Sequence, residues 1–263
     1  MNSGVFSALL SFMFSLASGI QPQVPMSLIV PTLVAEHHCV CILLKSLEQC
    51  TVLPIEIIIV ASSAEKNKTI GKLKKCITNF HVLNITLVLF KEKLHQADAR
   101  NVGVNLSKQL WISFFDGDDY LHPQRFEILQ YMMEKNPHVH LFLHDYREFF
   151  QHDPFRIQNI NVTDINIVLD PFTITKKYLE RGNEKKFIHE LFNNVNFANG
   201  WGTMTRMVFL KVNQWTEKFN LQDEDSRHNR DIVLKGFNVM VFDAVLGYYR
   251  KIEGSCKFIP VFE

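Results

Sequence analysis

One short segment of the chain places three carboxylates directly after an apolar run. Residues 112–115 are apolar apart from one serine, and Asp116, Asp118 and Asp119 follow them with only Gly117 in between. Carboxylates this close repel one another, so the cluster lowers stability unless a cation or hydrogen-bond donors neutralise it. Oxygen ligands on a loop suit Mg²⁺ or Mn²⁺, which bind through one or two carboxylates together with substrate phosphates. A solvated acidic turn fits the same residues, and the spacing alone leaves both interpretations open.

A second group of acids stands near the C-terminal end of the chain. Asp223, Glu224 and Asp225 precede Arg230 in a stretch with helical character. A carboxylate there could act as a general base, and a helix would point Glu224 and Asp225 in different directions. Acids at the start of a helix also stabilise it through the macrodipole. That structural role is compatible with catalysis.

Alternating strands and helices are expected to position these acids. The hydrophobic pattern predicts strands over 27–30, 55–60, 83–90 and 111–115, with helices over 36–50, 65–79 and 96–109 between them. This order implies an α/β fold with a mainly parallel sheet and right-handed crossovers. Ligands of such sheets bind at the carboxyl ends of the strands, where the first acid cluster falls. We expect Pro31 and Thr32 to end the first strand.

The pattern is less regular after the acid cluster. It predicts a helix from Pro123 to about residue 135, a strand over 138–144, a helix over 225–236 and a closing strand over 237–246. Residues 150–185 are mixed, and we expect a substrate-facing section there. Residues 199–202 are expected to form a loop, and 207–212 are too short to assign.

Composition limits the classes of protein to consider. The chain has 263 residues, of which 47% are hydrophobic and 21% charged, as in an ordinary globular protein. This length suits one large α/β domain. The formal net charge of +1 gives no electrostatic footprint for nucleic acid.

The N-terminus and the cysteines bear on the compartment. Residues 4–20 carry no charge, and three interpretations stay open for them: an atypical signal or anchor, an interfacial segment, or a helix packed on the domain. The five cysteines show no paired metal-binding spacing. We therefore expect reduced, structural thiols and a cytoplasmic protein, or one peripheral to a membrane on its cytoplasmic side.

Five segments in order resemble the family-2-like glycosyltransferases with the GT-A fold. They are Ser27–Thr32, Glu56–Val60, Ala97–Gly103, Phe115–Asp119 with the following His122–Pro123, and Glu224–Arg230. The resemblance implies a GT-A domain over 26–250, with a single Rossmann-like sheet flanked by helices and a less regular acceptor-side section. The apolar segment 1–25 and the tail 251–263 lie outside it.

The resemblance also implies roles for individual residues. Asp118 is expected to be the principal ligand of Mn²⁺ or Mg²⁺, with Asp116 beside it, and Asp225 is expected to be the general base of an inverting transfer. Glu224 is expected to contact the acceptor. Trp201 stands between Gly200 and Gly202, where an aromatic ring could stack on an acceptor sugar or simply fill a gap, and both interpretations stay open. The residues expected to bind the nucleotide-sugar are Pro31, Thr32, Glu36, Ser62, Arg100, Asp116, Gly117 and Arg230.

One departure from the family concerns the nucleotide. Ala61, Ser62 and Ser63 stand where the family commonly carries acids that contact the nucleobase. A UDP-sugar is therefore only the default donor for a hexosyltransferase, and the acceptor is a glycan, a lipid-linked molecule or a protein.

Two alternatives remain beside the transferase. The first is a degenerate GT-A fold that serves as a binding or assembly module and no longer catalyses sugar transfer. A nucleotidyltransferase is disfavoured because residues 28–36 contain neither glycine nor lysine. Membrane contact through the N-terminal segment stays open.

Overall fold

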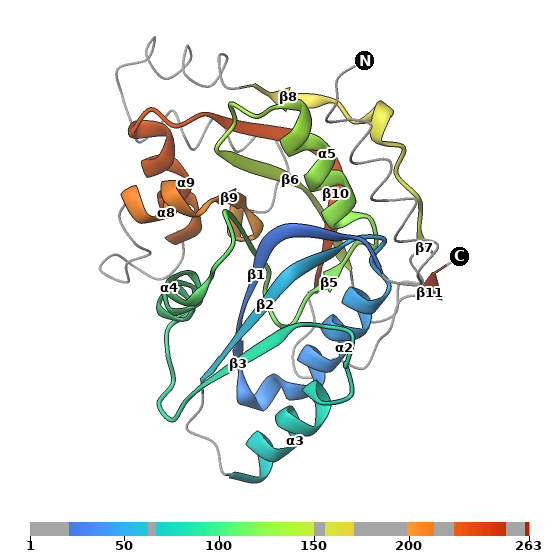
Figure 1. The fold of residues 1–263 in the computed structure, drawn as a ribbon, viewed down its shortest axis with the longest axis vertical. Coiled ribbons are helices and arrows are strands. Elements are labelled where there is room, and N and C mark those ends of the chain that lie inside the picture. The colour runs from blue at the N-terminus through green and yellow to red at the C-terminus, as the bar shows by residue number, and fades with distance from the viewer. Residues whose placement is uncertain are drawn as a thin grey trace.

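A nine-stranded sheet organises the chain in the computed structural model (Figure 1). The structure describes residues 21–62, 67–149, 156–170, 199–212, 224–250 and 261–262. The strand order is β3 (Ile85–Phe90), β2 (Leu53–Ser62), β1 (Gln23–Leu33), β4 (Trp111–Phe114), β9 (Thr203–Thr205), β6 (Leu141–Phe149), β10 (Val239–Arg250) and β5 (Tyr120–Leu121). β8 (Ile167–Leu169) pairs with β10, and β7 (Arg156–Ile157) pairs separately with β11 (Val261–Phe262).

Most of these strands run in one direction. β1, β2, β3 and β4 are mutually parallel, and β6 is parallel to β10. β9 lies antiparallel to both β4 and β6, so the two parallel groups point the same way. β5 and β8 are antiparallel to β10. The expected mainly parallel α/β sheet is confirmed.

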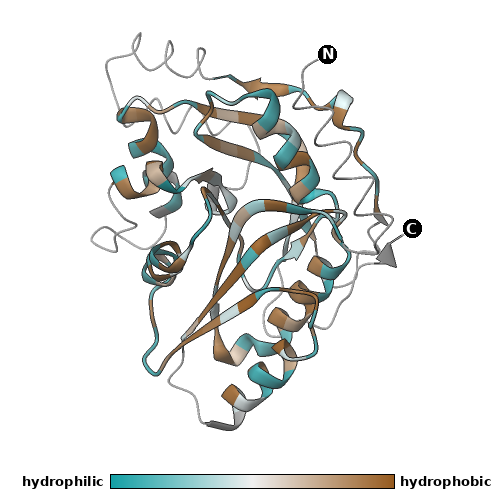
Figure 2. Cartoon of the chain, viewed as in Figure 1, coloured by the Kyte–Doolittle hydropathy of each residue, from teal (hydrophilic) through white to brown (hydrophobic). Residues whose placement is uncertain are grey.

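Helices cover both faces of the sheet. The described helices are α2 (His37–Glu48), α3 (Asn67–Ile77), α4 (Gln96–Leu106), α5 (Arg125–Lys135), α8 (Arg206–Lys211) and α9 (Glu224–Leu234), with 3₁₀ turns η1 (Val34–Glu36), η2 (Val162–Asp164) and η3 (Asn199–Trp201). One core cluster packs α2, α3 and α5 on one face, and another packs α4, α8 and α9 on the opposite face. Figure 2 shows the hydrophobic colour concentrated on the strands between them.

Side-chain alternation along β1 explains the two cores. Met26, Leu28 and Val30 point into the first cluster and Ile29 into the second. α4 approaches Ile29 so closely that a methyl group on Gly103 would lie 2.3 Å from its Cγ2 atom. The lack of a side chain at Gly103 therefore allows α4 to approach the sheet closely.

The expectation that Pro31 and Thr32 end the first strand is wrong. β1 continues to Leu33, pairing Pro31 with Val60 and Thr32 with Ala61 of β2. The carbonyl of Pro31 points the other way and accepts a hydrogen bond from the amide of Gly117. The missing N–H of the proline points to that same side, so the ladder with β2 loses no hydrogen bond.

The expectation that the thiols are reduced is wrong for at least three of them, because Cys39, Cys41 and Cys76 are disulfide-bonded. Cys41 on α2 and Cys76 on α3 form a disulfide, with Cα atoms 5.9 Å apart. The two helices pack on one face of the sheet, so cysteines distant in sequence meet there, which their spacing does not reveal. Cys50 is free and buried. The cysteines therefore no longer support a cytosolic assignment.

Other expected boundaries shift or fall outside the described residues. The strand predicted over 138–144 is β6, which begins at Leu141 and ends at Phe149. The unassigned stretch 207–212 falls mostly in α8, and the loop 199–202 contains η3. The apolar segment 4–20 and most of the predicted tail lie outside the described residues. Within the described part, no helix is long and apolar enough to cross a membrane.

Candidate active site

The acid cluster lies at the carboxyl ends of the parallel strands, directly after β4 in the middle of the sheet. The amide of Gly117 donates to the carbonyl of Pro31 over 3.2 Å, which ties the acidic loop to the end of β1. A methyl group on Gly117 would lie 2.7 Å from both Cβ and Oγ1 of Thr32. Glycine is therefore required for the loop to approach β1 this closely.

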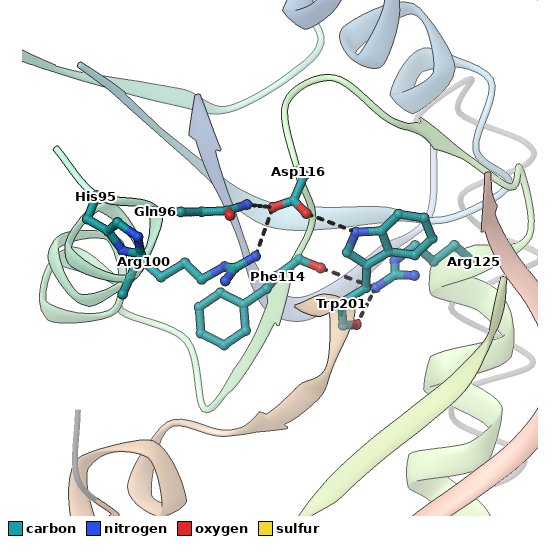
Figure 3. Close-up of polar contacts among 8 residues, drawn as sticks. His95, Gln96, Arg100, Phe114, Asp116, Arg125 and Trp201 are labelled. Atoms are coloured by element: carbon teal, nitrogen blue, oxygen red, sulfur yellow. Dashed lines mark hydrogen bonds and ion pairs between the residues drawn. The ribbon is translucent and has the colours of Figure 1, made fainter. Parts of the chain in front are cut away.

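Asp116 receives three hydrogen bonds from two different parts of the chain, α4 and η3 (Figure 3). Arg100 Nη2 donates to its Oδ1 over 2.9 Å, and Gln96 Nε2 donates to the same atom over 2.5 Å. The indole Nε1 of Trp201 donates to Oδ2 over 3.3 Å. Bonds from an arginine and two neutral donors fix the orientation of the carboxylate.

Asp118 and Asp119 lie in a less favourable environment for charge. Burial, the charge of Asp116 and the charge of Glu36 raise the pKa of Asp118 to about 6. Burial and the charges of Asp118 and Asp116 raise the pKa of Asp119 well above its usual value. The Oδ1 atom of Asp119 accepts from the backbone amide of Arg250 over 3.0 Å. Additional positive charge here would stabilise the ionised acids.

The donor set fits a hard divalent cation. Asp116 and Asp118 supply carboxylates on one loop, and Oδ2 of Asp119 is buried with no hydrogen-bond partner in the described structure. In the same part of the chain, no group of three or more His, Cys, Asp or Glu side chains could hold a metal ion alone. Mg²⁺ and Mn²⁺ sites commonly use one or two carboxylates and complete the shell with water and substrate phosphate.

The remaining residues expected to bind the nucleotide-sugar gather at this edge. Pro31 and Thr32 lie just before Leu33 at the end of β1, and Ser62 ends the neighbouring β2 with a buried side chain. Glu36 Oε2 accepts from the amide of Leu33 over 3.3 Å, and the glutamate charge acts on Asp118. The fold thus brings together residues from two strands and a turn.

Asp225, from the second group of acids, lies on α9 close to the acidic loop. A methyl group on Gly200 would lie 3.1 Å from Arg100 Nη2 and 3.3 Å from Asp225 Oδ2. Asp225 therefore lies beside the arginine that binds Asp116. Arg230 instead contacts its neighbour Asp231, with 3.3 Å between Nη2 and Oδ1. Glu224 begins α9, but its side chain lies outside the described part.

Trp201 links the site to the core. Its side chain is buried, and its ring lies 4.5 Å from the ring of Phe115 and 6.0 Å from that of Tyr146, centroid to centroid. Because the indole N–H donates to Asp116, the ring also orients that carboxylate. Its predicted contact with an acceptor stays a prediction.

Two residues that were not predicted from the sequence support this arrangement. Gln96 precedes the Ala97–Gly103 motif and holds Asp116, so its position beside the motif was the available signal. Arg125 is fully buried, and its Nη2 donates to Trp201 O over 2.9 Å and to Ser113 Oγ over 3.1 Å. Burial lowers the pKa of Arg125 to about 9. Arginines are usually exposed, so no sequence signal marked this one.

The fold is that of the GT-A glycosyltransferases. The sequence model described as glycosyl transferase family 2 matches residues 27–212. This match covers more than half of the chain and includes the acidic loop and Trp201. The chain belongs to glycosyl transferase family 2.

Similar proteins support this membership. A protein of Haemophilus influenzae described as an uncharacterized glycosyltransferase is 29% identical over 102 residues, which is 39% of this chain and 32% of that protein. The S. aureus TarS 1–349 structure is 14% identical with a TM-score of 0.60, covering 86% of this chain and 60% of that one. A Pyrobaculum calidifontis mannosyltransferase in complex with GDP-Man and Mn²⁺ is 13% identical with a TM-score of 0.55, covering 90% and 64%. The chain therefore spans less than two thirds of these proteins.

Proposed function

We propose that this protein transfers a hexosyl unit from a nucleotide-diphosphate-sugar to an acceptor hydroxyl, with a divalent cation and with inversion at the anomeric carbon. One observation carries the proposal: the carboxylates of Asp116 and Asp225 both lie beside the Arg100 guanidinium, although they come from β4 and α9. A donor held near the first carboxylate would thus be close to the second. Membership of the family supports this assignment.

The donor is assigned to the edge formed by β1, β2 and the acidic loop. Structural neighbours include TarS 1–349 in complex with UDP and with UDP-GlcNAc, and the Pyrobaculum enzyme with GDP-Man and Mn²⁺. UDP-sugars are the default donors. Ser62 can offer a hydroxyl to a nucleobase but no carboxylate, so it leaves the choice of base open. The nucleotide and sugar contacts are assigned to Pro31, Thr32, Glu36, Ser62, Arg100, Asp116, Gly117 and Arg230.

The metal ligands are Asp118 and Asp116 in this proposal. The raised pKa of Asp118 reflects burial and, after it, crowded negative charge, which Mn²⁺ or Mg²⁺ would relieve. When bound, such a cation stabilises the negative charge of a departing diphosphate. Arg100 orients Asp116, and Gly117 keeps the loop against β1.

Asp225 is the proposed general base. It accepts the proton of the acceptor hydroxyl as that oxygen forms its bond to the anomeric carbon and the bond to the diphosphate breaks. Glu224 and Trp201 are assigned to the acceptor, which is a glycan, a lipid-linked molecule or a protein. Trp201 also orients Asp116 through its N–H group.

The first test measures nucleotide binding and donor hydrolysis separately. The full chain is titrated with UDP, UDP-GlcNAc, UDP-Glc and GDP-Man with and without Mn²⁺, and nucleotide release is then followed. Asp225→Asn should lower turnover about 10²- to 10⁴-fold, a typical contribution of acid–base catalysis, with nucleotide affinity unchanged. Glu134→Gln, on the exposed side of α5, is the matched control. Undiminished turnover in Asp225→Asn would refute the base assignment.

A degenerate GT-A module is the second candidate, favoured only by the serines after β2. It predicts nucleotide binding without hydrolysis or transfer. Metal-dependent binding of one nucleotide together with turnover would exclude it, and no binding of any nucleotide would contradict the donor assignment.

A further inference from the structure

A cavity of about 400 Å³ lies beside β10, and its lining includes none of the residues assigned to the transfer reaction. It is bounded by β6, β10, the end of β5 and the segment 158–165. Its lining residues are His122, Arg147, Gln158, Ile160, Asn161, Asp164, Ile165, Asp243, Ala244, Val245 and Tyr248. Small-molecule sites have volumes of about 300–1,000 Å³, so the cavity is large enough for one or two sugar rings.

The segment that covers the cavity is anchored by side chains on its N-terminal half. The amide of Gln124 donates to His122 Nδ1 over 3.1 Å, so the proton of the ring is on Nε2, which donates to the carbonyl of Gln158 over 3.1 Å. The side chain of Gln124 accepts from the amide of Ile160 over 2.6 Å and donates to its carbonyl over 3.1 Å. This wall is therefore preformed.

Asp243 anchors the other end of the segment. Its two carboxylate oxygens accept from the backbone amide and from the side-chain amide of Asn166, each over 2.8 Å. The segment in the yellow part of the ribbon in Figure 1 is thus fixed to β10 as well as to the start of α5. A cavity held open in this way needs little reorganisation to accept a ligand.

The charges on the wall favour a neutral ligand. Arg147 is exposed, and among the described residues its guanidinium forms no ion pair or hydrogen bond. Two carboxylates, of Asp164 and Asp243, share the cavity with it, while burial lowers the pKa of His122 and keeps that ring neutral at pH 7. An anion would be attracted by one group and repelled by two.

The uncharged part of the wall suits a carbohydrate. Ile160, Ile165 and Val245 supply apolar surface for the C–H faces of a sugar ring. Asn161 and the phenol of Tyr248 add groups that can donate to and accept from hydroxyls. Apolar surface with a few convergent polar groups is the usual composition of a small-molecule site.

The cavity is close to the acidic loop along two covalent paths. His122 follows Asp118 by four residues, so their Cα atoms are at most about 14 Å apart. Tyr248 precedes Arg250, whose backbone amide donates to Asp119 over 3.0 Å. In addition, Arg147 and Tyr248 are paired in register near the carboxyl ends of two parallel strands. The cavity therefore lies within the length of a short oligosaccharide from Asp118 and Asp119.

We propose that this cavity is a subsite for a neutral saccharide unit of the acceptor, one or two sugar units away from the hydroxyl that reacts. The inference rests on the proposed transferase function for its biological meaning. The binding of a saccharide there is a separate physical claim. Arg147 and Asp164 would bind its hydroxyls, and Ile160, Ile165 and Val245 would pack against its ring faces.

The test measures saccharide and nucleotide binding on the same samples of the full chain. The probes are chitobiose, cellobiose, lactose and α-1,2-mannobiose, followed by calorimetry in the presence of UDP and Mn²⁺. Val245→Trp fills the cavity, and Arg147→Ala removes its free cation. Each should weaken the best-bound disaccharide at least about tenfold, the effect of losing about 1.4 kcal/mol of binding free energy. Val168→Trp on β8, outside the lining, is the matched control and should bind as the unaltered chain does.

Several outcomes would overturn the subsite. They are no binding of any of the four disaccharides, binding that both cavity variants leave unchanged, and tighter binding of a disaccharide that contains glucuronic acid. Failure of the proposed function gives a different result, in which UDP does not bind while a disaccharide still binds and Val245→Trp still weakens it. That result would support the cavity and reject the donor assignment.

Discussion

The indole Nε1 of Trp201 donates to Oδ2 of Asp116 over 3.3 Å, although the residues are 85 positions apart in the chain. The other oxygen of Asp116 is bound by Arg100 and Gln96. The tryptophan in η3 therefore fixes the rotation of a carboxylate that α4 holds from the other side. The proposed metal and nucleotide contacts of Asp116 depend on this orientation.

Trp201→Phe should weaken binding of UDP and Mn²⁺ about tenfold. The substitution keeps an aromatic ring in the core but removes a hydrogen bond to a charged group, and such bonds contribute about 1.5–3 kcal/mol. Titration calorimetry measures the change. Trp111→Phe is the control because that ring packs on Phe142 in the core. Equal affinities in the two variants would show that the indole N–H does not orient Asp116.

Gly117→Ala should destabilise the fold and weaken nucleotide binding together. The added methyl would lie 2.7 Å from Thr32, so the acidic loop or the end of β1 must move, at a cost of about 1–3 kcal/mol. Urea unfolding and UDP titration measure both effects. Gly71→Ala is the control: nothing lies within 4 Å of its added methyl in α3, and alanine there should stabilise by about 0.5–1 kcal/mol. A stable Gly117→Ala protein with normal UDP affinity would contradict the loop geometry.

Arg125→Met should lower the free energy of unfolding by about 3–5 kcal/mol, the usual cost of removing one partner from a buried charged network. The guanidinium bonds to Trp201, Ser113 and His144 would be lost, and methionine cannot replace them. Denaturant unfolding measures the loss. The control is Lys135→Met, which removes an exposed cation at the end of α5 and should change the free energy of unfolding by less than about 1 kcal/mol. A similarly small effect at Arg125 would mean that its network contributes little.

His144 should make stability fall as the pH is lowered. Its Nδ1–H donates to the carbonyl of Asp145 and its Nε2 faces Arg125, so burial and the arginine charge hold its pKa well below the usual value. The unfolded chain takes up a proton below about pH 6.5 and the folded chain does not, so up to about 1.4 kcal/mol of stability is lost per pH unit.

A comparison of variants isolates that contribution. The stability difference between the unaltered chain and His144→Gln should shrink between pH 7 and pH 5 in urea unfolding. The raised pKa of Asp118 acts in the opposite direction in both proteins and cancels in the difference. A constant difference at His144 would mean that the ring is protonated in the fold.

The parts of the fold that the sequence predicted are those with long, regular patterns. β2 is ten residues long and almost wholly buried, and its apolar run alone marked it as a strand. The acidic loop could be placed because it directly follows the buried β4. Its proximity to Asp225 depends on the packing of α9, which the resemblance implied and the pattern alone did not.

The parts that escaped prediction are short or unusual in residue type. β9 has three residues, Thr203–Thr205, too few to show any period. Arg125 is an arginine in a core, against the ordinary preference of that side chain. The disulfide between Cys41 and Cys76 depends on how two helices pack, which their spacing in the chain does not encode.

The position of β9 has a mechanical consequence. Among the described strands, β9 pairs with β4 on one side and with β6 on the other. Its three residues therefore make the only hydrogen-bonded connection that the described strands form between the group β3-β2-β1-β4 and the group β6-β10-β5. The donor edge lies on one side of this narrow join, and the cavity beside β10 lies on the other. Both core clusters also pack across β9, because each contains residues of β1 as well as residues of β6 and β10. The spacing between a donor and a sugar bound in the cavity would therefore be set by close packing around three residues that the sequence pattern did not reveal.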